Sequence, residues 1–338
     1  MAYEGVPYRP QLSRDSIHVM EVPNDDLELQ MVWLLGLERH GITLSHEHFA
    51  DFWTEEIQHG CDEYSVAIYN MNHGIMPPES GRIGNYFRDG MGAAIRSEIW
   101  AMAFAGRPDA AAHFAMLDAS VDHWGDGVWA EIFMAVLECH VLGGETPEQA
   151  IFSAMKQLPH DCRLKRALDS VITLYRQGAD RQSACDQIRN EWYHFNFTDC
   201  VMNLAFIVYA LLWGNGDFIE TVLAAIHCGR DTDCTASCGA IIAMAYGRKG
   251  IPAELLEKLG DTLILSPYIK AISGVPESIS ELVERTLAVQ KKLSASLTPA
   301  TYPAYQPSAV KELNPVKCRS HRADHIGHSL HTGFAERR

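Results

Sequence analysis

The 338-residue sequence contains no run of 18 or more apolar residues, which excludes a membrane-spanning helix. Positive charge is also scarce, because 28 Lys and Arg stand against 43 Asp and Glu, for a net charge of −15. A general nucleic-acid-binding protein needs a basic face for the phosphate backbone, so this balance argues against that class. Residues 1–10 lack the apolar core of a signal peptide, and we expect a cytoplasmic protein.

Cysteine is present, but without the spacing of a zinc site or a disulfide framework. The nine cysteines are odd in number and scattered, and no two form a C-x-x-C pair. Cys228, Cys234 and Cys238, with His227 beside them, leave a zinc site as the minor alternative. The main expectation is that the cysteines are reduced thiols packed in the core.

The apolar content and the helix-capping motifs of the sequence favour an all-helical fold. Apolar residues make up 47% of the chain, which is enough for a large core, and no series of strands with alternating polarity is visible. Two helix starts are well marked, because Thr146-Pro147 gives an N-cap followed by proline and Asp217 to Glu220 has the form of a capping box. We predict an all-α protein with helices at about 25–39, 46–58, 93–105, 108–120, 127–142, 147–158, 163–177, 180–192, 199–213, 217–227, 235–247, 252–259 and 276–295.

The longest stretch predicted to be irregular is 60–92, which contains Pro77-Pro78 and several glycines. A loop of this length within a compact domain is usually functional or disordered. It ends in Gly90-Met91-Gly92-Ala93, small residues that lead directly into an apolar helix. The backbone N–H groups of such a segment can hold a phosphate; a flexible surface loop that ends at a tightly packed helix start is an equal alternative.

Residues 297–338 lose the apolar periodicity and gain proline, serine, histidine, lysine and arginine. We therefore predict one helical domain over 1–296, followed by a disordered polar tail. Contact of this basic tail with a partner is the minor alternative.

The two aspartates of Asp231-Thr232-Asp233 are the clearest candidates for chemistry. In an extended segment, residues i and i+2 point the same way, so both carboxylates can reach one cation. Carboxylate oxygens suit Mg²⁺, Mn²⁺ or Ca²⁺ rather than zinc. Taken alone, the motif fits better with a helix cap and a solvated charge.

A second acidic helix start strengthens the metal interpretation. Asp25 and Asp26 follow Asn24 at the start of an apolar-periodic helix near the other end of the chain. Acidic residues there also have a structural explanation, since they complement the helix dipole. Helical bundles build two-metal sites from carboxylates on facing helices, so the four aspartates together predict such a site.

These motifs, in this order, resemble those of the ADP-ribosylglycohydrolase family, which includes the dinitrogenase-reductase-activating glycohydrolases. The similarity covers roughly residues 20–295. The matching segments are Asn24-Asp25-Asp26, Gly90 to Arg96, His123 to Gly127, His194 to Asn203, Leu211 to Gly214 with Asp217-Phe218, Gly229 to Cys234, Gly239-Ala240 and Ala245-Tyr246-Gly247.

The resemblance implies an all-α orthogonal bundle with two Mg²⁺ ions, or Mn²⁺, in a central cleft. It implies hydrolysis of the glycosidic bond that joins ADP-ribose to a protein or a small molecule. The charge balance and the lack of a long apolar run separately lead us to expect no nucleic-acid or membrane partner. The implied metal ligands are Asp25, Asp26, Asp231 and Asp233, with Asn24 as a further oxygen donor.

The resemblance also assigns the rest of the site. Gly90, Met91, Gly92 and Ala93 would bind the diphosphate, while His123 and Trp124 would lie near the ribose or adenine. Glycoside cleavage passes through an oxocarbenium-like state that nearby carboxylates stabilise. Asp26 or Asp233 is the expected acceptor of the proton from the attacking water.

Three departures from the family pattern bear on activity. Asn24 and Cys234 stand where threonines are usual, and a thiol is a poor ligand for Mg²⁺. Arg230 replaces a glycine, and its cation can pair with a substrate phosphate or partly fill an anionic site. The family's first helix has a Gly-Asp-Ala-Leu-Gly motif, followed by an acidic residue that some members use in catalysis. Neither has a counterpart within residues 1–24, so we expect a shortened N-terminus.

These departures leave two alternatives to a metal-dependent glycohydrolase. One is a catalytically impaired relative that binds ADP-ribose or serves as a structural protein. The other is an unrelated all-α metal phosphohydrolase. Retention of the four aspartates favours the enzyme, because a structural protein gains nothing from burying carboxylates without Lys or Arg partners.

Overall fold

The computed structural model describes residues 8, 12–16, 22–57, 60–235 and 237–297. Within these residues the fold is all-α, as predicted, and the β-type pairing is limited to one antiparallel bridge between Thr262 and Ser278. In the part of the chain that is described, no helix is both long and apolar enough to cross a membrane.

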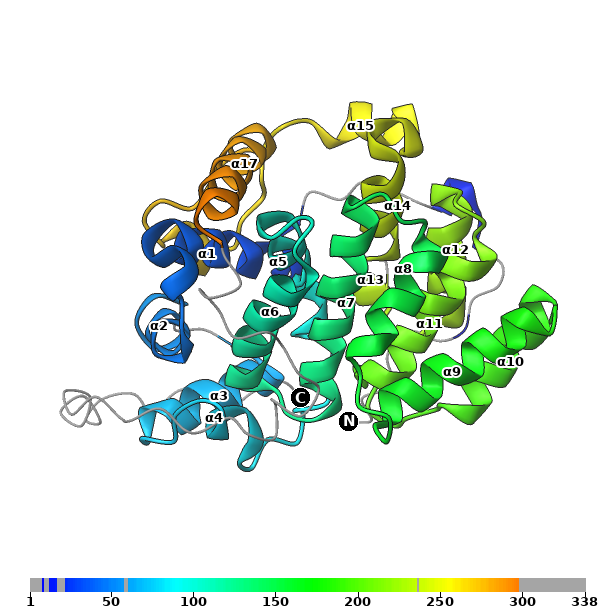
Figure 1. Cartoon of the computed structure of the whole chain (residues 1–338), viewed down its shortest axis with the longest axis horizontal. Helices are drawn as coiled ribbons and strands as arrows, with labels where there is room; N and C mark the ends of the chain where they lie inside the picture. Colours follow the sequence, from blue (N-terminus) through cyan, green and yellow to red (C-terminus); the bar gives the residue numbers. More distant parts are fainter. Residues whose placement is uncertain (1–7, 9–11, 17–21, 58–59, 236, 298–338) are drawn as a thin grey trace, which may run out of the picture.

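Seventeen α-helices are described, and several are joined by short 3-10 or π turns (Figure 1). The helices are α1 (Asp25–His40), α2 (His46–Asp51), α3 (Asp62–Asn72), α4 (Glu79–Arg82), α5 (Glu98–Ala103), α6 (Pro108–Asp122), α7 (Asp126–Leu142), α8 (Pro147–Ala154), α9 (Arg163–Arg176), α10 (Arg181–Glu191), α11 (Cys200–Trp213), α12 (Phe218–Cys228), α13 (Thr232–Thr235), α14 (Cys238–Tyr246), α15 (Ala253–Leu259), α16 (Pro267–Lys270) and α17 (Ile279–Ser296).

Helix α7 forms the centre of the fold. It packs against α5, α6, α8, α11 and α14, and its residues are buried along nearly the whole length. A helix that is apolar on every side is stable only when other helices surround it. Helices α6 and α7 lie side by side in Figure 1 because a three-residue connection, 123–125, joins them.

The first and last long helices are neighbours. Helix α17 packs against α1 and α5, and Figure 1 shows α17 (orange) beside α1 (blue). One hydrophobic core extends from Leu29 to Leu297, so Leu297, which was predicted to open the tail, is buried at the end of α17. Residues 298–338 of the predicted tail lie outside the described residues.

The predicted caps are confirmed. Gln149 N donates to Thr146 Oγ1 at 3.2 Å, and Thr146 N donates back to Gln149 Oε1 at 3.0 Å. Glu220 N donates to Asp217 Oδ1 at 2.9 Å at the start of α12. Each side chain therefore satisfies an N–H group that has no partner within its helix.

The prediction of an irregular stretch over 60–92 is wrong, because α3 and α4 lie within it. Tyr64, Ala67 and Met71 recur at helical spacing and are buried, so α3 packs one apolar face on the core. The glycines and prolines that follow hid this short pattern. The helix predicted at 93–105 is also shorter, because a 3-10 turn (Ala94–Arg96) precedes the six-residue α5.

Candidate active site

Asp25 and Asp26 begin helix α1, and Asn24 caps it. Asn24 Oδ1 accepts a hydrogen bond from Asp26 N at 2.8 Å. The oxygen that was predicted to be a metal ligand therefore serves as the N-cap of α1. The cap fixes the first turn and thereby the direction of both aspartates. The residue Asn24 is exposed, whereas Asp26 is half-buried.

The Asp231–Asp233 segment is not extended, contrary to the geometry assumed from the sequence. It turns into the one-turn helix α13, and Thr235 N donates to Asp231 O at 3.0 Å. The tight turn still gathers the side chains, since ligand atoms of Asp231, Asp233 and Cys234 lie within 4.8 Å of one another. Asp231 is buried at 4% exposure, which a solvated cap would not be.

The aspartates from the two ends of the chain influence one another electrostatically, but among the described residues the group with ligand atoms within 4.8 Å of one another contains Asp231, Asp233 and Cys234, not Asp25 or Asp26. Loss of solvent, together with the charge of Asp233, raises the pKa of Asp25. Burial, then the charges of Asp25 and Asp233, raise the pKa of Asp26 well above its usual range. Burial and the charge of Asp233 raise the pKa of Asp231 to about 8. Such mutual shifts require neighbouring carboxyls in a partly desolvated space.

A hard divalent cation fits this cluster. Asp26 Oδ1 is buried and has no hydrogen-bond partner among the described residues. The main influences on the pKa values of Asp25, Asp26 and Asp231 include no Lys or Arg. The donors are carboxylate oxygens, which Mg²⁺ and Mn²⁺ prefer. Burial and the nearby aspartates raise the pKa of Cys234, so its thiol is neutral and a poor ligand.

The cysteines follow the packing interpretation rather than the zinc alternative. The eight described cysteines are free thiols, and seven are buried. Cys228 and Cys238 lie in the hydrophobic core, apart from the group of Asp231, Asp233 and Cys234.

The segment Gly90–Ala93 is buried, and the side chains of Met91 and Ala93 pack in the core. Any contact of this segment with a ligand must therefore come from its backbone. A Cβ atom at Gly92 would lie 2.0 Å from Glu63 Oε1 and 2.6 Å from Tyr64 Oη, so any larger residue would have to displace these two side chains. Tyr64 Oη donates to the Gly92 carbonyl at 3.0 Å.

Arg96 anchors this segment, a role that the sequence pattern did not reveal. Its fully buried guanidinium donates to Asp118 Oδ1 at 2.8 Å and to Asp122 Oδ1 and Oδ2 at 2.9 Å. It also donates to the Gly92 carbonyl at 3.1 Å. The available signal was the pair Asp118 and Asp122, four residues apart on the mostly apolar α6.

His123 lies between two carboxylates. Its Nδ1 is 2.7 Å from Asp122 Oδ1, and its Nε2 is 3.4 Å from Glu63 Oε1. Burial opposes a charge here, but Asp122 and Glu63 outweigh it and raise the pKa of His123 to about 9. The side chain is therefore an imidazolium at neutral pH. Trp124 is half-buried, with the Arg82 guanidinium 5.8 Å from its ring.

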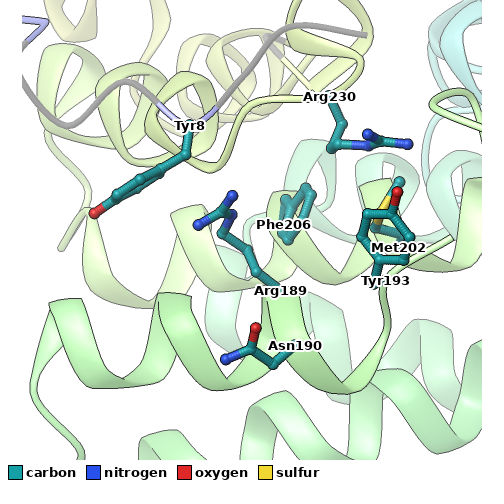
Figure 2. Close-up of a pocket in the computed structure, with 7 residues that line it drawn as sticks. All are labelled: Tyr8, Arg189, Asn190, Tyr193, Met202, Phe206 and Arg230. Carbon is teal, nitrogen blue, oxygen red and sulfur yellow. The ribbon is translucent and has the colours of Figure 1, made fainter. Parts of the chain in front are cut away.

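Two cavities adjoin these elements. One of about 270 Å³ opens beside Asp25 and is walled by Trp53, Ile57, Tyr64 and Ile269, among others. The other, of about 470 Å³, lies over α10 and α11. Figure 2 shows its lining: Tyr8, Arg189, Asn190, Tyr193, Met202, Phe206 and Arg230.

Arg230 lines the second cavity in a strained conformation. Its φ of 70° is one that glycine adopts without penalty and other residues adopt at a cost of about 1–2 kcal/mol. Its Nη2 donates to the His194 carbonyl at 2.7 Å, and its guanidinium lies 5.1 Å from the Tyr193 ring. Arg230 thus supports the loop that precedes α11. In the sequence, Arg230 is the residue directly before the buried Asp231.

The chain is an all-α protein whose acidic residues offer the oxygen donors that hard divalent cations prefer. Comparison with models of known families matches residues 4–295 to ADP-ribosylglycohydrolase. The chain therefore belongs to the ADP-ribosylglycohydrolase family, which excludes the unrelated all-α phosphohydrolase considered from the sequence. The search of curated proteins finds no match.

Proposed function

We propose that this protein is a divalent-metal-dependent hydrolase that releases ADP-ribose from an ADP-ribosylated protein or small molecule. Asp25, Asp26, Asp231 and Asp233 would hold two Mg²⁺ ions, or Mn²⁺ ions. The observation that carries the proposal is the buried, unpartnered Asp26 Oδ1 within a cluster of carboxyls that raise one another's pKa.

The chain's own residues account for the other requirements of the reaction. The backbone of Gly90–Ala93 would receive the diphosphate, and the His123 imidazolium would add positive charge beside it. The cavity next to Asp25 would take the group that leaves, since it opens at the carboxylates where C1″ must lie. When bound, the divalent ions supply positive charge that keeps the aspartates ionised and polarises the oxygens of the sugar.

In the reaction itself, the bond between C1″ and the carrier breaks, and its electron pair leaves with the carrier. The oxygen of a water molecule forms the new bond to C1″, and a carboxylate of Asp26 or Asp233 accepts the proton that the water loses. The negative charge of the cluster stabilises the oxocarbenium-like transition state.

A catalytically impaired relative that binds ADP-ribose is the second candidate. The observation that favours it is the neutral Cys234 thiol, which lies among the ligand atoms of Asp231 and Asp233. A thiol does not replace a hard oxygen ligand of Mg²⁺, so one ion would bind more weakly.

Calorimetric titration of Mg²⁺ and then ADP-ribose into the wild type and the Asp231→Asn/Asp233→Asn variant tests the proposal. We expect both ligands to bind the wild type, Mg²⁺ binding to be lost in the variant, and wild-type protein to release ADP-ribose from an ADP-ribosylated substrate only with the metal. Failure of the wild type to bind either ligand would refute the proposed function. Binding of both ligands without turnover would favour the impaired relative.

A further inference from the structure

We propose that Cys185 and Cys228 are a modification site, which a hydroperoxide oxidises to an intramolecular disulfide that weakens metal binding by the segment Asp231–Asp233. Cys185 belongs to α10, and Cys228 is the last residue of α12. Formation of the disulfide does not depend on the proposed function. Its effect on metal binding does rest on that function, because it assumes that the two aspartates hold a divalent ion.

The two thiols lie next to each other, although 43 positions separate them along the chain. Both are free and buried, and their Sγ atoms are 3.4 Å apart. Reacting atoms about 3–3.5 Å apart are close to the arrangement in which a bond can form, so the fold supplies the proximity that the reaction needs. Because a disulfide bond is about 2.05 Å long, the two sulfur atoms must approach by about 1.4 Å.

The surroundings of Cys185 favour its thiolate, which is the reactive form of cysteine. Arg189 follows Cys185 by four residues, so both side chains lie on one face of α10. The Arg189 Nε–H donates to the Cys228 carbonyl at 3.2 Å, which places this guanidinium beside the two thiols. The hydrogen bond with Cys228 lowers the pKa of Cys185; burial opposes this shift, and the charge of Arg189 adds to it.

A cavity gives a small oxidant a route toward the two thiols. Arg189 and Asn190 line the cavity of about 470 Å³ over α10 and α11, one turn along the helix from Cys185 (Figure 2). The half-buried Arg189 side chain therefore borders the cavity and also contacts the carbonyl of Cys228. Hydrogen peroxide is small enough to enter this space, and a shift of Arg189 would open the last step to the sulfur of Cys185.

The oxidation has two steps. The Cys185 thiolate attacks one oxygen of hydrogen peroxide, the O–O bond breaks, and the released hydroxide takes up a proton to become water. The product is a sulfenic acid at Cys185. The Cys228 thiol then attacks this sulfur, the S–O bond breaks, and a second water leaves as the S–S bond forms. In sum, two thiols lose two electrons and two protons, and one peroxide becomes two water molecules.

The connection from Cys228 to the aspartates is short. Only Gly229 and Arg230 lie between Cys228 and Asp231, and their φ angles of 76° and 70° make this connection a tight turn. An approach of the sulfur atoms by about 1.4 Å therefore displaces Asp231 or strains the turn that holds it. Mg²⁺ requires near-ideal octahedral geometry, so a displaced carboxylate would hold the ion less tightly.

Mass spectrometry of the full chain, digested without reduction after peroxide treatment, tests the modification site. We expect a cross-linked peptide that joins Cys185 to Cys228 and that dithiothreitol separates. Cys185→Ala and Cys228→Ala should each abolish it. Cys162→Ala is the matched control, because Cys162 is also buried but its Sγ accepts a hydrogen bond from Lys165 N, and this variant should still form the cross-link.

Calorimetry with Mg²⁺ alone measures the consequence of the disulfide. We expect oxidation to weaken Mg²⁺ binding by the wild type about 10-fold, the lower end of the effect of disturbing residues that support metal ligands. Dithiothreitol should restore the affinity, a comparison that needs no variant. The same peroxide treatment should leave the affinity of Cys185→Ala unchanged, which excludes oxidation elsewhere in the chain as the cause.

Three outcomes would count against these expectations in different ways. A peroxide-treated wild type without the cross-link between Cys185 and Cys228 would overturn the modification site. A complete cross-link with an unchanged Kd for Mg²⁺ would overturn its coupling to the aspartates. Failure of the reduced wild type to bind Mg²⁺ would refute the proposed function and the coupling with it, whereas the cross-linked peptide would still establish the modification site.

Discussion

Replacing Asp231 by asparagine should stabilise the metal-free protein. Burial and the charge of Asp233 raise the pKa of Asp231 from 3.8 to about 8. In the unfolded chain this carboxyl ionises above about pH 4, whereas in the folded protein it keeps its proton to about pH 8. Unfolding thus releases a proton, and the free energy of unfolding falls as the pH rises between these values.

The magnitude follows from the same shift. At pH 7 the relevant difference is that between the solution pH and the unfolded pKa of 3.8, which is about three units. At 1.36 kcal/mol per unit, the raised pKa of Asp231 lowers the free energy of unfolding by up to about 4 kcal/mol. Solvent screening reduces this little, because Asp231 is only 4% exposed. Between pH 5 and pH 7 the advantage of Asp231→Asn over the wild type should grow by about 3 kcal/mol.

Urea denaturation in EDTA at pH 5, 6 and 7 measures this difference. Asp169→Asn is the control, because its side chain is 57% exposed and pairs with Lys165 at the surface, so we expect a change within about 0.5 kcal/mol. Mg²⁺ at 100 times its Kd should stabilise the wild type by about 2.7 kcal/mol, but not Asp231→Asn. The reasoning fails if Asp231→Asn is the less stable protein in EDTA at pH 7, or if the difference does not grow with pH.

Three further predictions concern folding. Arg96→Leu leaves the buried carboxylates of Asp118 and Asp122 without their cation and should cost about 3–5 kcal/mol in urea denaturation; a loss below about 1 kcal/mol would contradict this. Burial lowers the pKa of His46 to about 4, so unfolding takes up a proton at acid pH and stability should fall by up to about 3 kcal/mol from pH 6.5 to pH 4; His46→Gln should weaken that dependence. Gly92→Ala places a Cβ atom 2.0 Å from a carboxylate oxygen and should destabilise by about 1–3 kcal/mol; an unchanged melting temperature would show that the segment yields freely.

Local pattern predicts the helices where apolar periodicity and a cap coincide. Helices α8 and α12 begin where Thr146 and Asp217 indicate, because a cap uses only residues within four positions of itself. Helix α3 was missed because its apolar face is short and is followed by Pro77, Pro78 and glycines. The turn at Asp231 was also misjudged, since the tertiary fold, not local spacing, decides between an extended segment and a helical turn.

In the candidate site, too, local motifs predict some residues, whereas tertiary packing decides how they are arranged. Asp25 and Asp231 could be selected from the sequence because each lies in an acidic motif, but their common electrostatic environment depends on how distant helices pack. Glu63 carries no sequence signal, because its relation to Gly92 and His123 arises only when α3 packs beside the α6–α7 connection. Contacts between residues far apart in the sequence leave no periodic pattern.

The central claim is that the four aspartates hold two divalent ions, and anomalous diffraction from crystals soaked in Mn²⁺ tests it directly. We expect two anomalous peaks about 4 Å apart, the usual spacing of a two-metal site, in contact with Asp25, Asp26, Asp231 and Asp233. A crystal without a peak at these carboxylates, or with its peaks at other residues, would contradict the account.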